Sequence, residues 1–201
     1  MRRHLVVCLE GCHGSGKTEL CKQLASQGFA VLDEAFMDMP SFPSLHPQSL
    51  AMEMLWVSKW FERLLRWTTT TSKQSVLFAD RSPYSAVLYT RHAADGATQL
   101  ERLIGLLLKE LEATAHIEIV SVLVAVDAAL LWARIQARLV REPQRARLAE
   151  ADMDWFVRTL DFYQSRAKLW NYRVTNDKRD DEAVSHLLKE LKEVYPEHFG
   201  A

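Results

Sequence analysis

The stretch Gly11-Cys-His-Gly14-Ser-Gly16-Lys17-Thr18 decides the fold of this 201-residue chain. It matches the pattern G-x-x-x-x-G-K-[ST], in which backbone N–H groups of a glycine-rich loop surround phosphate oxygens. Residues 4–9 before it form an apolar run typical of a buried parallel strand, and residues 17–27 after it predict a helix. Because strand, loop and helix follow in the order that the motif requires, the sequence predicts a phosphate-binding loop (P-loop) rather than a chance match in a tight turn.

The P-loop prediction assigns roles to individual residues. We expect Lys17 to reach the β- and γ-phosphates of a nucleoside triphosphate, and the Thr18 hydroxyl to ligate Mg²⁺. The N-terminus of the following helix adds a favourable partial charge beside the phosphates. The predicted phosphate-binding residues are Gly11, Cys12, His13, Gly14, Ser15, Gly16, Lys17 and Thr18. The side chains of Cys12 and His13 receive no chemical role from the motif.

Composition and charge exclude several classes of protein. Lysine and arginine total 25 against 26 aspartates and glutamates, a net charge of −1, so no overall basic field recruits nucleic acid. The length fits one domain, residues 1–201, and no run of 18 apolar residues predicts a membrane span. The cysteines, Cys8, Cys12 and Cys21, are odd in number and clustered. They indicate reduced thiols and a cytoplasmic protein rather than a disulfide framework or a zinc site.

Strand and helix signals alternate along the rest of the chain. Further strands are predicted at residues 29–32, 76–79, 119–126 and 172–175. Further helices are predicted at residues 48–67, 83–91, 98–113, 128–140, 150–170 and 182–194. This alternation predicts an α/β fold, with a five-stranded parallel sheet that helices cover on both faces. An arginine-rich lid is expected at about residues 138–150.

Motifs that the sequence lacks narrow the function. The chain has no D-x-x-G sequence, and Asn176-Asp-Lys-Arg-Asp180 differs from the N-K-x-D base-reading motif, which argues against a GTPase. No additional domain of the kind that a mechanical ATPase uses is visible in so short a sequence. The sequence therefore favours a compact kinase that phosphorylates a small acceptor.

The segment Asp80-Arg81-Ser82, at the end of the third predicted strand, resembles the D/E-R-S motif of the deoxynucleoside kinases. Their relatives, the thymidylate kinases, carry D-R-Y at this place. The resemblance spans most of the chain through four features in order: the P-loop, Glu34 after the second strand, the D-R-S motif, and the arginine-rich residues 134–147. It implies a P-loop kinase fold, ATP and Mg²⁺ as cofactors, and transfer of a phosphoryl group to a deoxynucleoside 5′-hydroxyl. It also implies a homodimer.

The resemblance implies roles for residues at the strand ends. Glu34 would orient the 5′-hydroxyl and accept its proton, because a neutral hydroxyl is a poor nucleophile. The family places a proline after this carboxylate, and here Ala35 replaces it, so the choice between Asp33 and Glu34 stays open. Arg81 would hold the acceptor oxygen near the γ-phosphate, and Asp80 would hold Mg²⁺ through water. The alternative for Asp80 and Arg81 is a buried ion pair that caps the strand.

The lid supplies further candidates. Arg134, Arg138 and Arg141 are spaced i, i+4 and i+7, so they share one helix face. Arg138 and Arg141 are the candidates for stabilising the transferring phosphoryl group, and a solvated basic helix end is the alternative. Glu142 resembles the family's lid glutamate, which binds the sugar 3′-hydroxyl.

The helix at 48–67 should carry the groups that read the base. Glu53 stands where deoxynucleoside kinases usually have a glutamine, and an ionised glutamate only accepts hydrogen bonds. Glu53 either faces the base or lies exposed. The tryptophans of this helix, Trp56, Trp60 and Trp67, favour a core or a subunit interface over a ligand stack. Leucines and isoleucine between 103 and 111 cover more than one helix face, which makes a homodimer interface plausible.

Two other functions compete with a deoxynucleoside kinase. A thymidylate-type kinase, whose acceptor is a monophosphate, usually has an arginine where this chain has Asp33, and a second carboxylate would repel that phosphate. A nucleotide-binding switch would need neither Glu34 nor Arg81. The sequence therefore favours the deoxynucleoside as the acceptor.

Overall fold

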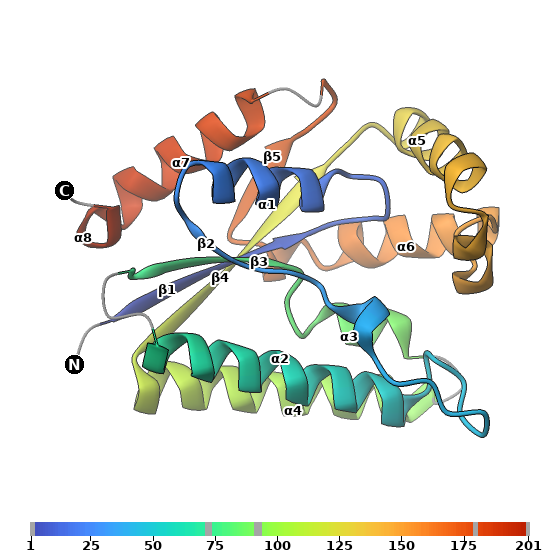
Figure 1. Ribbon diagram of the computed structural model, residues 1–201, viewed down its shortest axis with the longest axis horizontal. Helices are drawn as coiled ribbons and strands as arrows, with labels where there is room; N and C mark the ends of the chain where they lie inside the picture. Colours follow the sequence, from blue (N-terminus) through green and yellow to red (C-terminus); the bar gives the residue numbers. More distant parts are fainter. Residues whose placement is uncertain (1–2, 71–73, 91–93, 179–180, 200–201) are drawn as a thin grey trace.

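We describe the protein from a computed structural model at residues 3–70, 74–90, 94–178 and 181–199. Five parallel strands form one sheet in the order β2-β3-β1-β4-β5 (Figure 1). The strands are β1 (His4–Glu10), β2 (Ala30–Leu32), β3 (Val76–Asp80), β4 (Ile117–Ala125) and β5 (Tyr172–Thr175). The predicted α/β fold with a five-stranded parallel sheet is therefore confirmed.

Helices connect the strands and cover the sheet. The longer ones are α1 (Lys17–Ser26), α2 (Leu50–Thr70), α4 (Ala94–Glu110), α5 (Ala128–Arg141), α6 (Met153–Ser165) and α7 (Glu182–Val194). The shorter ones are α3 (Ser85–Tyr89), α8 (Pro196–Phe199), η1 (Phe36–Asp38), η2 (Leu111–Ala115), η3 (Pro143–Leu148) and η4 (Ala167–Leu169). Helices α1 and α7 lie on one face of the sheet, and α2 and α4 on the other (Figure 1).

The central strand β1 shows why both faces carry a core. Its side chains alternate between two clusters: Leu5 and Leu9 pack with α1 and α7, whereas Val6 and Cys8 pack with α2 and α4. All seven residues of β1 are buried. A strand that is buried on both faces has a continuous apolar sequence, so the alternation of its side chains between the two faces does not show as an alternation of apolar and polar residues.

The helix after the arginine-rich stretch differs from its predicted bounds. The helix expected at 150–170 begins only at Met153, because Asp152 caps it by accepting hydrogen bonds from the N–H groups of Asp154 and Trp155. It ends at Ser165 and is followed by the short η4. Residues 143–148 of the arginine-rich stretch form η3. Helices α5, η3 and α6 together lie over one edge of the sheet (Figure 1).

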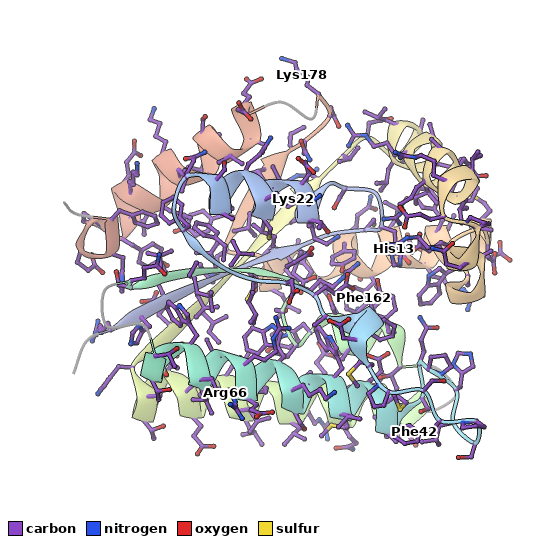
Figure 2. All side chains as sticks on the ribbon, in the orientation of Figure 1. His13, Lys22, Phe42, Arg66, Phe162 and Lys178 are labelled. Atoms are coloured by element: carbon purple, nitrogen blue, oxygen red, sulfur yellow. The ribbon has the colours of Figure 1, made fainter. Side chains whose placement is uncertain are left out.

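That edge is where all five strands end. In the register of β1 and β3, Leu9 stands opposite Asp80, so Glu10 and the P-loop lie beside the D-R-S motif. Parallel sheets bind ligands at this carboxyl edge. Figure 2 shows His13 where the lid meets the sheet, and the side chains of Lys22 and Arg66 on α1 and α2 are exposed. Among the described residues, no helix combines the length and apolar character that crossing a bilayer requires.

Candidate active site

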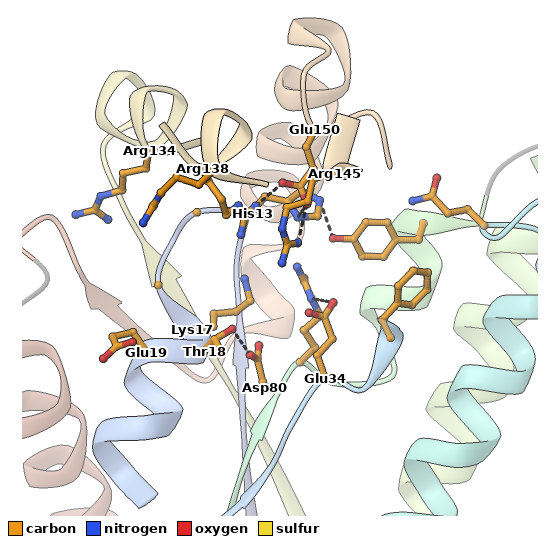
Figure 3. Close-up of a pocket in the computed structure, with 17 residues that line it drawn as sticks. His13, Lys17, Thr18, Glu19, Glu34, Asp80, Arg134, Arg138, Arg145 and Glu150 are labelled. Carbon is orange, nitrogen blue, oxygen red and sulfur yellow. Dashed lines mark hydrogen bonds and ion pairs between the residues drawn. The ribbon is translucent and has the colours of Figure 1, made fainter. Parts of the chain in front are cut away.

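A cavity of about 440 Å³ opens at the carboxyl edge, between the P-loop, the strand ends and the lid (Figure 3). It brings together residues that are up to 137 positions apart in the sequence, from His13 to Glu150. The cavity is lined by His13, Gly14, Gly16, Lys17, Thr18, Glu19, Glu34, Phe36, Gln48, Asp80, Arg81, Tyr89, Arg134, Arg138, Arg141, Arg145 and Glu150.

The P-loop keeps a conformation that requires glycine. Gly16 has a φ of 94°, in the left-handed region, and a Cβ there would lie 2.4 Å from Nδ2 of Asn176. Asn176 is buried, and its Nδ2 donates to the Ser15 carbonyl at 2.8 Å. The loop after β5 thus fixes the middle of the P-loop, a contact that the sequence does not reveal.

Lys17 lies inside the curve of the P-loop. Its Nζ donates to the carbonyls of Gly11 at 2.7 Å and Cys12 at 3.0 Å. Burial and then the positive charge of Arg81 lower the pKa of Lys17 to about 8. A polyanionic triphosphate in the cavity would favour the charged ammonium and so compensate for both effects.

Thr18 and Asp80 form a hydroxyl–carboxylate pair that suits Mg²⁺. Thr18 Oγ1 donates to Asp80 Oδ2 at 2.6 Å, while the buried Asp80 Oδ1 has no hydrogen-bond partner among the described residues. That oxygen is available to hold a metal-bound water. The described residues contain no group of three metal-ligating side chains.

Glu34 and Arg81 face each other across the cavity floor. Arg81 Nε donates to Glu34 Oε1 at 2.7 Å, and the side chains are 4% and 37% exposed, respectively. Partial burial raises the pKa of Glu34, but the charge and hydrogen bond of Arg81 and the charge of Lys17 outweigh it and hold the pKa below its ordinary value. Glu34 is therefore an ionised acceptor at neutral pH.

Asp33 points away from the cavity. Its side chain is 73% exposed and pairs with Arg63 of α2. Of the two acidic residues after β2, the structure thus places only Glu34 in the cavity. The sequence argument that Asp33 would repel an acceptor phosphate is wrong, because its carboxylate does not line the site.

Two tryptophans of α2 hold the backbone of Glu34 and Arg81. Trp56 Nε1 donates to the Glu34 carbonyl at 2.9 Å, and Trp60 Nε1 donates to the Arg81 carbonyl at 3.2 Å. Both rings are buried in the core beneath the cavity, and Trp67 packs edge-on against His4. The prediction that these tryptophans belong to a core is confirmed for Trp56 and Trp60, and the core supports the site directly.

The lid arginines separate into two kinds. Arg134 donates to the backbone carbonyls of Asn176 and Asp177, so its guanidinium braces the loop after β5. Arg138 and Arg145 both bind the carboxylate of Glu150, whose side chain is fully buried. Arg138, Arg141 and Arg145, like Arg134, line the cavity, and Arg141 at the end of α5 is also exposed to solvent.

Glu142 does not join these arginines in the cavity. It pairs with Arg145 and lies outside the lining residues. The hydrogen bond with Arg145 lowers the pKa of Glu142. The side chain of Arg147 is outside the described part of the structure.

Comparisons with known proteins identify the family and the fold of the chain. Residues 6–161 match the sequence profile of a family described as an AAA domain. The chain belongs to the AAA domain family. No curated protein sequence matches it.

Solved structures with this AAA domain's fold include deoxyadenosine kinase from M. mycoides. The structure with bound dCTP has a TM-score of 0.60 and 13% identity, and the match covers 94% of this chain and 99% of that one. The structure with bound dATP has a TM-score of 0.59 and 12% identity, and the match covers 94% of this chain and 100% of that one. The structure with the products dCMP and a flexible dCDP has a TM-score of 0.58 and 12% identity, and the match covers 94% of this chain and 99% of that one. At this level of identity the likeness shows the fold.

Sequence reasoning missed a histidine-centred link in the AAA domain. His13 Nδ1 lies 3.3 Å from Glu150 Oε1, and its Nε2 lies 3.0 Å from the Tyr89 hydroxyl. Burial and then the nearby cations, Arg81 first, hold the pKa of His13 well below its ordinary value. In the neutral ring Nδ1–H donates to the carboxylate, so Nε2 accepts from Tyr89. The P-loop is thereby joined to the lid and to α3. In the sequence, Glu150 could have been noticed as a carboxylate that follows the arginine-rich stretch.

Two aromatic rings and one side-chain amide form the remaining wall of the cavity. Phe36 and Tyr89 have ring centroids 6.4 Å apart and planes inclined by 31°. Gln48, which is only 2% exposed, completes this wall with an amide that both donates and accepts. Two rings and an amide suit a planar heterocycle with polar edges.

Glu53 lies outside this wall. It is 1% exposed and does not line the cavity, so the alternative of an exposed Glu53 is wrong. Burial raises its pKa to about 8, and the Glu34 charge adds to this against the opposing charge of Arg81. Glu53 is therefore protonated at neutral pH and, like a glutamine, carries both a donor and an acceptor.

Proposed function

We propose that this AAA domain is an ATP-dependent kinase that transfers the γ-phosphoryl group to the 5′-hydroxyl of a deoxynucleoside. The observation that carries the proposal is the Glu34–Arg81 pair in the same cavity as Lys17 and Thr18. A protein that only binds a triphosphate needs the P-loop but has no use for an ionised carboxylate beside it. The fold shared with deoxyadenosine kinase supports the proposal.

On the donor side, the P-loop N–H groups and Lys17 would bind the β- and γ-phosphates of ATP. Thr18, and Asp80 through water, would hold Mg²⁺, which when bound neutralises phosphate charge. Arg138, Arg141 and Arg145 would contact the γ-phosphoryl oxygens from the lid, where negative charge is spread in the transition state. Glu150 would keep two of these arginines in place.

On the acceptor side, Glu34 would accept the proton of the 5′-hydroxyl while the hydroxyl oxygen bonds to the γ-phosphorus. The bond between that phosphorus and the β–γ bridging oxygen breaks, and ADP leaves. Arg81 would hold the attacking oxygen and the transferring group in line. Phe36, Tyr89 and Gln48 would enclose the base. Because Glu53 and Glu142 lie outside the cavity lining, we do not assign them contacts with the base or the sugar.

A deoxynucleoside monophosphate is the second candidate acceptor. It is favoured by one observation: Arg138, Arg141 and Arg145 give the cavity several cations, and Asp33 does not oppose an acceptor phosphate.

The resemblance to the deoxynucleoside kinases also leads us to propose a homodimer, and the exposed leucines Leu103 and Leu106 of α4 support it. Sedimentation velocity of the wild-type chain measures this directly.

Single-turnover transfer from ATP, with a deoxynucleoside panel and the matching monophosphates, tests the kinase proposal. Glu34→Gln keeps the shape of the side chain but removes the proton acceptor, so nucleoside kcat should fall at least about 100-fold while ATP affinity stays unchanged. Asp33→Asn is the matched control and should retain wild-type turnover. Loss of activity in the Asp33 variant alone, or a wild type that prefers monophosphates, would contradict the proposal.

A further inference from the structure

Glu10 is a buried carboxylate at the edge of the candidate site. It ends β1, directly before the P-loop, is 0% exposed, and does not line the cavity. Oε1 accepts hydrogen bonds from the Ser82 N–H at 2.7 Å and the Ser82 hydroxyl at 2.6 Å. Oε2 accepts from the Ser85 hydroxyl at 2.9 Å and the Tyr163 hydroxyl at 3.1 Å. Four donors from three elements converge on a group that no proposed chemical step uses.

Two of these donors also contact Arg81. Arg81 Nη1 donates to the Tyr163 hydroxyl at 3.2 Å and to the Ser85 hydroxyl at 3.4 Å. A hydroxyl has one proton to give, and the Glu10 carboxylate takes it, so the oxygen's lone pairs are turned toward the guanidinium. Each hydroxyl thus connects the negative charge of Glu10 to the positive charge of Arg81 without direct contact between the two.

The guanidinium is fixed at two of its three nitrogens. Nε is bound to Glu34, and Nη1 is bound to the two hydroxyls and, at 3.5 Å, to the Gly11 carbonyl. Among the described residues, no protein atom accepts a hydrogen bond from Nη2. The contacts of Glu10 and Glu34 therefore leave Nη2 for an oxygen of the substrate.

The backbone of Arg81 also depends on Glu10. Arg81 has a φ of 81°, in the left-handed region that non-glycine residues rarely adopt. Its N–H donates to the Leu9 carbonyl at 3.0 Å, and its carbonyl accepts from Trp60. The next N–H, that of Ser82, is the one that Glu10 binds. Glu10 thus fixes the peptide that follows this unusual conformation.

We propose that Glu10 is a positioning residue that sets the orientation of Arg81 through Ser82, Ser85 and Tyr163. Its effect on turnover rests on the proposed kinase function, whereas its hold on Arg81 does not. Removing the charge of Glu10 slows phosphoryl transfer and leaves ATP binding unchanged, because Ser82, Ser85 and Tyr163 lie outside the P-loop and the contact of Arg81 with the Gly11 carbonyl of the P-loop is long, at 3.5 Å.

Arginine side-chain NMR tests the hold on Arg81 in the protein without substrates. The Nε–H resonance of Arg81, assigned by its disappearance in Arg81→Lys, should exchange with solvent slowly in the wild type. Exchange should be at least tenfold faster in Glu10→Gln, because the N–H groups of the glutamine amide would then face the N–H and hydroxyl donors of Ser82, Ser85 and Tyr163. Tyr163→Phe removes one hydroxyl without changing the ring and should act in the same direction. Unchanged exchange in Tyr163→Phe would overturn the proposal even where Glu10→Gln does not fold.

A matched control comes from the same helix as Tyr163. Thr159 is buried one turn earlier, and its hydroxyl donates only to the Trp155 carbonyl among the described contacts. Thr159→Val deletes a buried hydroxyl of α6 that does not touch Arg81. It should leave both Nε–H exchange and turnover at the wild-type level, and a change equal to that of Tyr163→Phe would overturn the proposal.

A double-mutant cycle separates positioning from general loss of structure. Glu10→Gln should lower kcat at least tenfold with an unchanged ATP Kd, and the double variant with Arg81→Lys should be no slower than Arg81→Lys alone. Effects that multiply in the double variant would overturn the proposal, because Glu10 would then act independently of Arg81. If the wild type phosphorylates no nucleoside or nucleotide, the proposed function fails, and the NMR measurement still decides whether Glu10 holds Arg81.

Discussion

Replacing Glu53 with glutamine should change how the stability of the protein depends on pH. Burial raises the pKa of Glu53 from its ordinary value of 4.5 to about 8. Between these two values the folded protein holds one proton more at this position than the unfolded chain. Glu53 therefore contributes stability that is fully present below about pH 4.5 and is lost as the pH rises toward 8.

The size of the effect follows from the linkage between proton binding and stability. Each pH unit inside this window removes about 1.4 kcal/mol, so the contribution of Glu53 should fall by about 2–3 kcal/mol between roughly pH 5.5 and 7.5. Glutamine does not titrate, and its amide reproduces the donor and acceptor of the protonated carboxyl. The difference in unfolding free energy between the two proteins should therefore change by this amount over the same range.

Urea denaturation at several pH values, followed by tryptophan fluorescence, measures that difference. Glu62→Gln is the control, because Glu62 lies exposed on the same helix and pairs only with Arg66 among the described residues. Its stability should remain parallel to that of the wild type. If the stability of Glu53→Gln also runs parallel to the wild type from pH 5.5 to 7.5, Glu53 is ionised in the fold and the reasoning from its burial fails.

Three further substitutions test the donor side of the site. Lys17→Ala should remove about 3–5 kcal/mol of transition-state stabilisation, measured from kcat/KM, and turnover within tenfold of the wild type would remove Lys17 from the mechanism. Thr18→Ala should raise the Mg²⁺ concentration for half-maximal rate at least tenfold, whereas Thr18→Ser should not; equal behaviour of the two would exclude the hydroxyl as a ligand. Glu150→Gln should lower kcat about tenfold with little change in nucleoside KM, since Arg138 and Arg145 lose their shared anion, and an unaltered kcat would show that they need no such support.

Much of the fold could be predicted because its signals are local. The P-loop, the apolar runs of the strands and the helix patterns each lie within a few residues, and the alternation of strands and helices predicts a parallel sheet. Local pattern left the choice between Asp33 and Glu34 open, and only the structure places Glu34 in the cavity and Asp33 outside it. Boundaries in the lid were less predictable, because the cap at Asp152 competes with a helix signal that begins at Glu150.

Contacts between distant segments could not be predicted in the same way. Glu10 and Tyr163 are 153 residues apart, and neither belongs to a motif. The burial of Glu53 depends on how α2 packs, and a glutamate in a helix is usually exposed. Arg134 has the spacing of a lid arginine, yet the carbonyls after β5 bind its guanidinium. Such roles follow from tertiary packing, which one sequence does not specify by pattern.

The product that the enzyme makes from ATP and a deoxynucleoside tests the central claim most directly. Wild-type protein is incubated with ATP, Mg²⁺ and each deoxynucleoside in turn, and the products are identified by mass spectrometry and quantified with the ADP released. The Glu34–Arg81 geometry predicts that at least one deoxynucleoside yields its 5′-monophosphate in equal amount to ADP, and that Glu34→Gln slows the formation of both at least about 100-fold. ADP formed without any nucleotide product, or phosphorylation of monophosphates alone, would contradict the claim that the acceptor in this cavity is a 5′-hydroxyl.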